Sequence, residues 1–95
     1  MRLVFAPLAA RRLREIQAYI AFAASLSTAL GVIHRIRQSA EMLTDFPLLG
    51  REWGDGATRA LQVSGLPYRI HYRLRGDVVE IVTIHHDRQK PPRFG

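Results

Sequence analysis

The chain has 95 residues and a formal net charge of +6, and 47% of its residues are hydrophobic. This length suits one domain, residues 1–95, with a modest core, and the hydrophobic fraction argues against wholesale disorder. The absence of cysteine excludes disulfides and thiolate metal sites and is typical of a reducing cytoplasm. Residues 1–13 contain too short an apolar run for a signal peptide or a membrane span. We expect a cytoplasmic protein without a membrane segment, metal or cofactor.

The positive charge comes almost entirely from arginine, because Lys90 is the only lysine. Guanidinium groups bind carboxylates and phosphates in a forked geometry, which favours an acidic partner or a nucleic acid. A GC-rich genome also raises the arginine content, so composition alone leaves both explanations open.

The N-terminal half predicts a strand followed by two helices. Residues 2–6 alternate in polarity, and Pro7 marks the switch to a helix. Residues 8–24 carry an apolar side chain every three or four positions, with Arg11 and Arg14 outside that stripe. Those arginines are interpreted as a solvated helix face, with partner binding as the alternative.

A second helix is expected from an N-cap at Ser25 or Ser27 to the residues before Pro47. The short connection predicts an antiparallel helical hairpin. Gly31 lies inside this helix at a cost of about 1 kcal/mol relative to Ala, so we expect a close backbone contact there.

Residues 47–57 contain three glycines and one proline and predict a loop. We expect Trp53 to anchor this loop to the core, with stacking on a nucleotide as the alternative. Residues 58–63 predict a strand, and residues 87–95 predict an irregular tail.

The stretch Leu66–His86 predicts a β-hairpin around a II′ turn at Gly76–Asp77. Counting outward from the turn pairs Leu74 with Val79, Tyr72 with Ile81 and Ile70 with Thr83. Alternation then predicts a core face of Tyr68, Ile70, Tyr72, Leu74, Val79, Ile81, Thr83 and His85. The second face would carry Arg69, His71, Arg73, Arg75, Val78, Glu80, Val82, Ile84 and His86. The predicted fold is α+β, a helical hairpin packed on a curved, mainly antiparallel sheet in the order β-α-α-β-β-β.

Some of these side chains have purely structural interpretations. Arg73 opposite Glu80 predicts a cross-strand ion pair, and His85 predicts a hydrogen-bonded core residue. His86 fits a structural or a functional role equally well. Val82 and Ile84 would leave apolar area exposed on the basic face, so we expect a partner or the tail to cover them.

Several stretches together resemble the RelE/ParE superfamily of type II toxins. They are LAARRLREIQAYIA, FPLLGRE, LPYRIHYRLRGDVVEIVTIHH and the HxRQxPPRF tail. The resemblance implies a small toxin neutralised by a cognate antitoxin whose C-terminal segment wraps the toxin. The antitoxin is expected to be ParD-like and acidic, and to contact Val82, Ile84 and the helix-face arginines Arg11 and Arg14.

The RelE-like branch of this superfamily comprises ribosome-dependent mRNA endonucleases. The resemblance places Arg69 against the scissile phosphate and His86 where some members carry a terminal acid or base, and Arg59 could supply another cation. The predicted register puts Arg69 and His86 on the same face. Three departures argue against this branch: Phe46 stands where some nuclease members have a carboxylate, no tyrosine follows His86, and the loop before the second strand has no lysine.

The ParE-like branch poisons DNA gyrase by binding, and the VEIVTIHH strand followed by Arg88 and Gln89 is more similar to this branch. We therefore expect a ParE-like toxin that binds gyrase through Arg69, Arg73, His86 and Arg88. The alternatives are a RelE-like endonuclease acting on ribosome-bound mRNA and a non-toxic module that binds nucleic acid.

Overall fold

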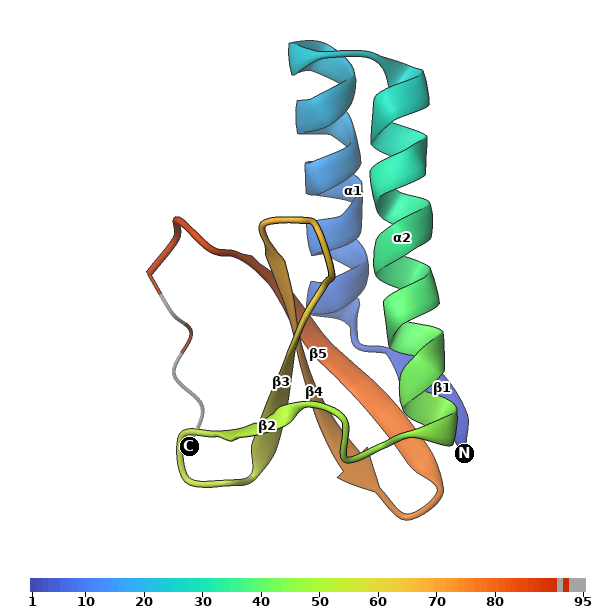
Figure 1. The fold of residues 1–95 in the computed structure, drawn as a ribbon, viewed down its shortest axis with the longest axis vertical. Helices are drawn as coiled ribbons and strands as arrows, with labels where there is room; N and C mark the ends of the chain where they lie inside the picture. Colours follow the sequence, from blue (N-terminus) through green and yellow to red (C-terminus); the bar gives the residue numbers. More distant parts are fainter. Residues whose placement is uncertain (91, 93–95) are drawn as a thin grey trace.

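The computed structural model describes residues 1–90 and 92, which form a five-stranded sheet with two helices packed against one face (Figure 1). The elements are β1 (Arg2–Phe5), α1 (Pro7–Ala23), α2 (Leu26–Asp45), β2 (Arg51–Trp53), β3 (Thr58–Gln62), β4 (Tyr68–Arg75) and β5 (Val78–His86). The strand order is β1-β5-β4-β3-β2. The α+β architecture predicted from the sequence is confirmed, with one short additional strand, β2, inside the predicted loop.

The two helices form the predicted antiparallel hairpin. Pro7 occupies the first turn of α1, where its missing N–H costs nothing. Ser25 caps α2, because its Oγ accepts a hydrogen bond from the backbone N–H of Thr28 at 3.0 Å. The lower half of the hairpin covers the sheet, whereas its upper half projects beyond the sheet (Figure 1).

The hydrophobic core lies between this hairpin and the middle of the sheet. β4 contributes Ile70 and Tyr72, β5 contributes Ile81, and all three are fully buried. From the helices, Leu13 and Ile36 pack into the same cluster. The central strands thus present an apolar face to the helices, as their alternating sequence predicts.

β4 and β5 pair around Gly76, whose φ of 56° is the left-handed conformation that the first position of a II′ turn requires. The predicted pairs Leu74–Val79 and Tyr72–Ile81 are confirmed. The predicted pair Ile70–Thr83 is wrong, because a register shift after Tyr72 pairs Ile70 with Ile84.

This β-bulge places one extra residue, Val82, in β5 and reverses the alternation of every residue that follows it. Ile84 is therefore 2% exposed and belongs to the core, not to the basic face. His85 is buried as predicted but lies opposite Arg69 on the outer face, the face away from the helices. His86 lies opposite Tyr68 on the helix side.

The expectation of a close contact at Gly31 is also wrong. No described atom outside its own helix turn would lie within 4 Å of a Cβ built at this position. No helix in the described residues 1–90 and 92 is long and apolar enough to cross a lipid bilayer. The predicted tail lies partly outside the description, which omits residues 91 and 93–95.

Candidate functional site

Arg69 and His86, the two residues predicted to share a nuclease site, lie on opposite faces of the sheet. Arg69 pairs with His85 in the β4–β5 ladder, and His86 pairs with Tyr68. Adjacent residues of a strand point to opposite faces, so the bulge that moves His85 outward moves His86 toward the helices. The two side chains cannot act on one phosphate in this arrangement.

The outer face carries a compact cluster of rings where an open basic surface was predicted. Trp53 meets His71 edge-on with the ring centroids 5.0 Å apart, and His71 meets His85 at 5.8 Å. The Arg69 guanidinium lies over the Trp53 ring, 5.4 Å from its centroid. This cation–π contact holds Arg69 at the rim of the cluster, where its side chain is half-buried.

The histidine at the centre of this cluster has a strongly perturbed pKa. His71 is fully buried. Burial, followed by the nearby charges of His85 and Arg69, lowers the pKa of His71 to about 4. His71 is therefore neutral at physiological pH.

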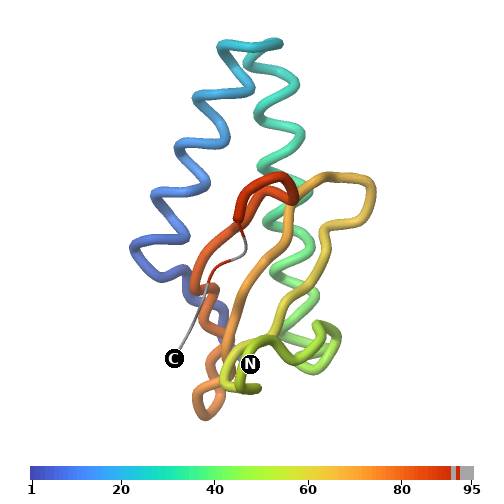
Figure 2. The backbone as a smooth tube through the Cα atoms, turned by 90° about the vertical axis from the view of Figure 1, so that its left-hand side faces the viewer, coloured from blue at the N-terminus to red at the C-terminus, as the bar shows by residue number. Residues whose placement is uncertain are grey.

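The segment that follows β5 turns back alongside the sheet (Figure 2), and its described residues are bonded to two members of this cluster, His85 and Trp53. His85 Nε2 donates to the backbone oxygens of Gln89 at 2.9 Å and Lys90 at 3.2 Å. The indole N–H of Trp53 donates to the backbone oxygen of Pro92 at 3.2 Å. Trp53 thus connects the β2 loop to His71 and to the tail, and it does not join the hydrophobic core to which it was predicted to anchor the loop.

The orientation of His86 is set by the turn that follows it. The backbone N–H of Arg88 donates to His86 Nδ1 at 3.0 Å. In the neutral ring the proton is therefore on Nε2, so the ring offers a donor on that side and not a base. His86 packs edge-on against Tyr68, with the centroids 5.2 Å apart.

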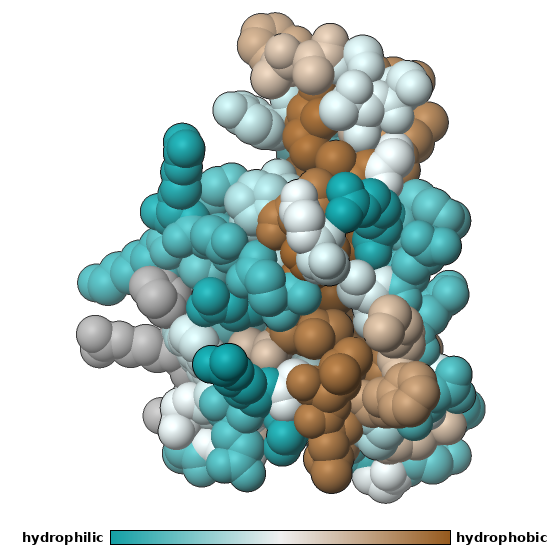
Figure 3. Space-filling view, viewed as in Figure 1, coloured by the Kyte–Doolittle hydropathy of each residue, from teal (hydrophilic) through white to brown (hydrophobic). Residues whose placement is uncertain are grey.

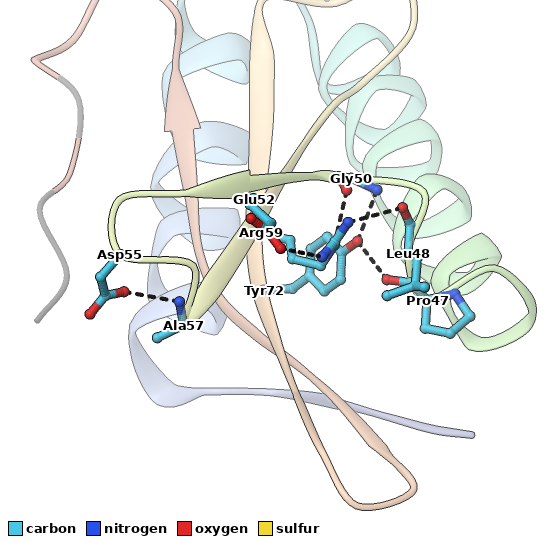
Figure 4. A network of polar contacts seen from close by, with 8 residues as sticks. All are labelled: Pro47, Leu48, Gly50, Glu52, Asp55, Ala57, Arg59 and Tyr72. Atoms are coloured by element: carbon cyan, nitrogen blue, oxygen red, sulfur yellow. Dashed lines mark hydrogen bonds and ion pairs between the residues drawn. The ribbon is translucent and has the colours of Figure 1, made fainter.

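Arg59, the third nuclease candidate, is engaged by the loop that follows α2 (Figure 4). Its Nε donates to the backbone oxygen of Gly50 at 2.9 Å, and a terminal nitrogen donates to that of Leu48 at 3.3 Å. The Tyr72 hydroxyl braces the same loop by donating to the backbone oxygen of Pro47 at 2.7 Å. Arg59 therefore stabilises the loop.

Gly50 is required where this loop meets the sheet. Its backbone N–H donates to the Tyr72 hydroxyl oxygen at 2.9 Å. A Cβ at position 50 would lie 2.7 Å from the Tyr72 ring and 2.9 Å from the backbone oxygen of Ala60. A side chain here would push the loop away from β3 and β4.

Arg73 forms the predicted cross-strand ion pair with Glu80. Arg75 approaches the same carboxylate at 3.7 Å. The Arg73 side chain remains 39% exposed, so the pair lies at the surface of the outer face and leaves this region with a net positive charge.

A groove of about 400 Å³ opens on the opposite side of the sheet, between α1 and the end of β5. Its lining combines rings with cations: Arg12, Glu15, Ile16, Tyr19, Tyr68, Ile84, His86, Arg88 and Gln89. Arg12 pairs with Glu15 at 2.6 Å, whereas Arg88 is exposed. Burial, and then the Tyr19 phenol, raise the pKa of Tyr68, which keeps its hydroxyl protonated.

Comparison with known proteins identifies the family of this chain. A family model described as the ParE toxin of the type II toxin–antitoxin system parDE matches residues 3–91. The chain belongs to the ParE toxin family.

A curated relative and a solved structure agree with this assignment. This ParE-family toxin is 39% identical over 85 residues to "Putative toxin Y4kP" of Sinorhizobium fredii (strain NBRC 101917 / NGR234). The aligned residues cover 90% of this chain and 86% of that protein. Its fold is similar to a chain of the chromosomal ParDE TA system from P. aeruginosa, with a TM-score of 0.82. That alignment covers 90% of this chain and 95% of the other, and at 22% identity it concerns the fold alone.

The remaining predicted contacts of the ParE-family toxin differ in accessibility. Arg11 and Arg14 are exposed on α1, whereas Val82 is half-buried at the bulge. Ile84 lines the groove beside α1 but is only 2% exposed. Within residues 1–90 and 92, no group of three His, Asp or Glu side chains is arranged to hold a metal ion.

Sequence reasoning missed the Trp53–His71–His85 cluster and the groove beside α1. The cluster had a weak signal, since His71 lies between two core residues of β4 in a chain with a single tryptophan. The groove had none, because Tyr19 and His86 are 67 positions apart and meet only through the packing of α1 on β5.

Proposed function

We propose that this ParE-family toxin arrests growth by binding DNA gyrase and that a cognate ParD-like antitoxin neutralises it. The observation that supports binding over RNA cleavage is the separation of Arg69 from His86 by the sheet. Cleavage needs a cation and an acid or base around one phosphate, and misplacement by about 1 Å can cost a hundredfold in rate. Arg59 cannot replace either group while it binds the loop carbonyls.

The surface proposed to contact gyrase lies around the ends of β4 and β5. Arg69 and Arg73 line the outer face, and Arg88 is exposed just beyond β5. The guanidinium groups of Arg69 and Arg73 are held at the surface by a ring contact and an ion pair, respectively, and the backbone N–H of Arg88 is bonded to His86. Restrained cations lose less entropy on binding a carboxylate or phosphate than mobile ones do. His86 would contribute from the helix side of the same end.

The groove beside α1 is the region that we propose for the antitoxin. Arg11 and Arg14 flank it on α1, and Arg88 closes its far side. An amphipathic helix can place apolar side chains against Tyr19 and Ile16 while its carboxylates pair with the arginines. The acidic antitoxin segment expected for this family has this chemistry.

Gyrase supercoiling assays with the purified toxin test the target. We expect inhibition accompanied by cleaved DNA, and we expect R69E/R88E to abolish both effects. The matched control R2E changes an exposed arginine on β1, which pairs with Val78 at the opposite end of β5 from Arg88, and should remain inhibitory. Rapid, ribosome-dependent mRNA cleavage without an effect on gyrase would contradict the proposal and favour the endonuclease.

A second pair of variants separates the target from the antitoxin. R11E/R14E should weaken antitoxin binding and leave gyrase inhibition unchanged, whereas R69E/R73E, which leaves the lining of the groove beside α1 intact, should lose gyrase inhibition and keep antitoxin binding. Growth arrest on expression without antitoxin distinguishes a toxin from a simple nucleic-acid-binding module. Equal loss of both activities in R11E/R14E would contradict two distinct surfaces.

A further inference from the structure

The sheet has a gap at its edge, between residues 49–51 and residues 61–62. β2 pairs with β3 only as far as Ala60, so Gln62 has β4 on one side and no described strand on the other. Continuation of the β2 register would bring Leu49 opposite Gln62, but the Leu49 N–H is bonded within its own loop at 3.1 Å. At Gly50 the chain turns away to the Tyr72 hydroxyl, which leaves this edge of β3 uncovered.

The backbone of Gln62 points its polar groups into this gap. The Val63 N–H donates to the backbone oxygen of Tyr68 at 2.9 Å, so these two residues form a hydrogen-bonded pair between β3 and β4. Such pairs alternate along an antiparallel ladder, so the N–H and C=O of Leu61 face β4 and those of Gln62 face away from it. The Gln62 side chain is held toward β5, because its Nε2 donates to the Asp87 carboxylate at 3.0 Å. An uncovered strand edge of this kind is a template for another strand.

A pocket of about 570 Å³ occupies the gap. Its lining takes residues from both faces of β3, Leu61 from the helix side and Ala60 and Gln62 from the outer face, so the pocket opens at the edge of the sheet. Leu49, which is 47% exposed, adds a further apolar side chain. Figure 3, drawn in the view of Figure 1, shows apolar surface down the middle of the molecule and strongly hydrophilic surface beside it, where β2 lies.

Two arginines at the gap have no acidic partner in the described chain. Arg51 is exposed, and the Arg69 guanidinium lies 5.4 Å from the centroid of the Trp53 ring. Within residues 1–90 and 92, neither arginine forms an ion pair. Glu52, the acid in this lining, faces Arg59 at 3.9 Å. The gap therefore combines a strand edge with apolar side chains and unpaired cations.

We propose that an extended acidic segment of the target protein binds in this gap as an additional strand on β3. The edge offers both an N–H and a C=O, which another peptide backbone matches, whereas a phosphate oxygen can only accept a hydrogen bond. Because side chains alternate along a strand, carboxylates of the added segment can pair with Arg51 and Arg69 on the outer face. Its apolar side chains then contact Leu61 on the helix side.

The identification of this target as gyrase rests on the proposed function, in which Arg69 belongs to the gyrase surface. The acidic antitoxin segment is assigned to the groove beside α1, at the end of β5, and β4 separates β5 from β3 in the sheet. The gap shares Arg69 with the outer face and no residue with that groove. Its occupant is therefore the target and not the antitoxin.

Amide exchange tests this pairing at single residues. The full-length toxin is placed in heavy water alone, with purified gyrase or with antitoxin, and the retained protons are read by NMR after the toxin is recovered. The Gln62 amide should exchange rapidly in the free toxin and slowly in the gyrase complex, and antitoxin should leave its exchange unchanged. The Leu61 amide, which already faces β4, is the internal control and should exchange slowly throughout.

Two variants test the backbone and the charge separately. Proline is tolerated at an edge position whose N–H faces outward, so Q62P should fold, and it should bind gyrase about tenfold more weakly than Q62A. Q62A is the matched reference, because it loses the same side-chain bonds and keeps the N–H. R51E leaves the backbone intact and should weaken gyrase binding by about fivefold to tenfold. R2E, an exposed arginine far from the gap, should bind as the wild type does.

A gyrase complex in which the Gln62 amide still exchanges rapidly would overturn the proposal. Equal gyrase affinities of Q62P and Q62A, or wild-type affinity of R51E, would also overturn it. Protection of Gln62 by antitoxin and not by gyrase would have the same effect, since the edge would then belong to the antitoxin.

A separate outcome concerns the proposed function alone. If the wild-type toxin binds no gyrase, that function fails, and a short synthetic peptide of alternating valine and glutamate tests the edge by itself. The peptide should slow exchange of the Gln62 amide, and the same peptide with methylated backbone nitrogens should not. Rapid exchange with both peptides would overturn the strand site as well.

Discussion

The two faces of the sheet are buried by different chemistry. The helix side is closed by apolar side chains, with Ile36 of α2 and Ile81 of β5 both fully buried. The outer face is closed by Trp53, His71 and His85 under a short tail that is held by hydrogen bonds. The stability gained from buried apolar side chains does not depend on pH, but it falls when a side chain is shortened. The stability of a histidine cluster depends on the protonation state of its rings.

This contrast indicates that the helix side supplies most of the stability, whereas the stability of the outer face depends on pH. The described part of the tail is held by hydrogen bonds to His85 and Trp53 that are only partly buried. Segments of this kind open locally at a lower free energy than the core. The following variants test this division, beginning with the largest expected effect.

Truncation on the helix side should cost the most. I81A removes a fully buried side chain from the centre of the core and should lower the free energy of unfolding by about 2–5 kcal/mol. Urea denaturation followed by circular dichroism measures the loss. The control V78A, at a half-buried position on the outer face of the same strand, should cost much less. Equal losses from I81A and V78A would contradict the division between the faces.

Acid should destabilise the protein through His71. The unfolded chain binds a proton at this residue near pH 6.5, but the folded chain binds it only near pH 4. Between these values the unfolded state holds more protons, so stability falls as the pH decreases and is fully present above pH 6.5. The loss should approach about 3 kcal/mol below pH 4.

Urea titrations of the wild type and H71F at pH 7.5, 5.5 and 4 measure this effect. The slope between pH 6.5 and 4 should flatten in H71F, whatever its stability at neutral pH. H34Q changes an exposed histidine on α2 and should keep the slope of the wild type. An identical slope in H71F and the wild type would show that His71 does not titrate in this window.

Y72F tests the polar edge of the helix-side core. It removes the hydroxyl that donates to Pro47 and accepts from the backbone N–H of Gly50. A buried donor left without a partner costs about 1–3 kcal/mol, so the free energy of unfolding should fall by this amount. Y19F, which changes an exposed phenol, should fall within about 0.5 kcal/mol of the wild type. A neutral Y72F would show that the loop does not depend on this bridge.

The smallest effect is expected at the ion pair of Arg73 with Glu80. The Arg73 side chain is 39% exposed, so solvent screens the pair. A double-mutant cycle of R73A and E80A should give a coupling energy of about 1 kcal/mol or less, measured by urea denaturation. A coupling well above this value would place the outer face among the main sources of stability.

Most elements could be predicted from the sequence because each has a local cause. Pro7 and Ser25 mark the starts of the helices, and Gly76 marks the turn of the hairpin. The Arg73–Glu80 pair followed from counting outward from that turn. Local conformational preferences and an alternating pattern suffice for these features.

The candidate site was predicted less well, because one extra residue in β5 changed the outcome. Counting from the turn remains correct as far as Ile81, and the bulge at Val82 then moves Ile84, His85 and His86 to the opposite faces. Val82 and Ile84 are both apolar, so their order did not reveal which of them enters the core. The edge strand β2 was also missed, since its three residues lie in a loop rich in glycine.

The sequence by itself determined the family, the helical hairpin, the β4–β5 turn and a basic composition suited to acidic partners. These features depend on near neighbours in the chain and on overall residue content. Tertiary structure alone decided that Arg69 and His86 are on opposite faces and that Trp53 meets His71. It also decided that the end of the helical hairpin around Phe22 is exposed. The reason is physical: faces, clusters and exposed ends depend on which distant segments pack together, and one bulge is enough to redirect a side chain.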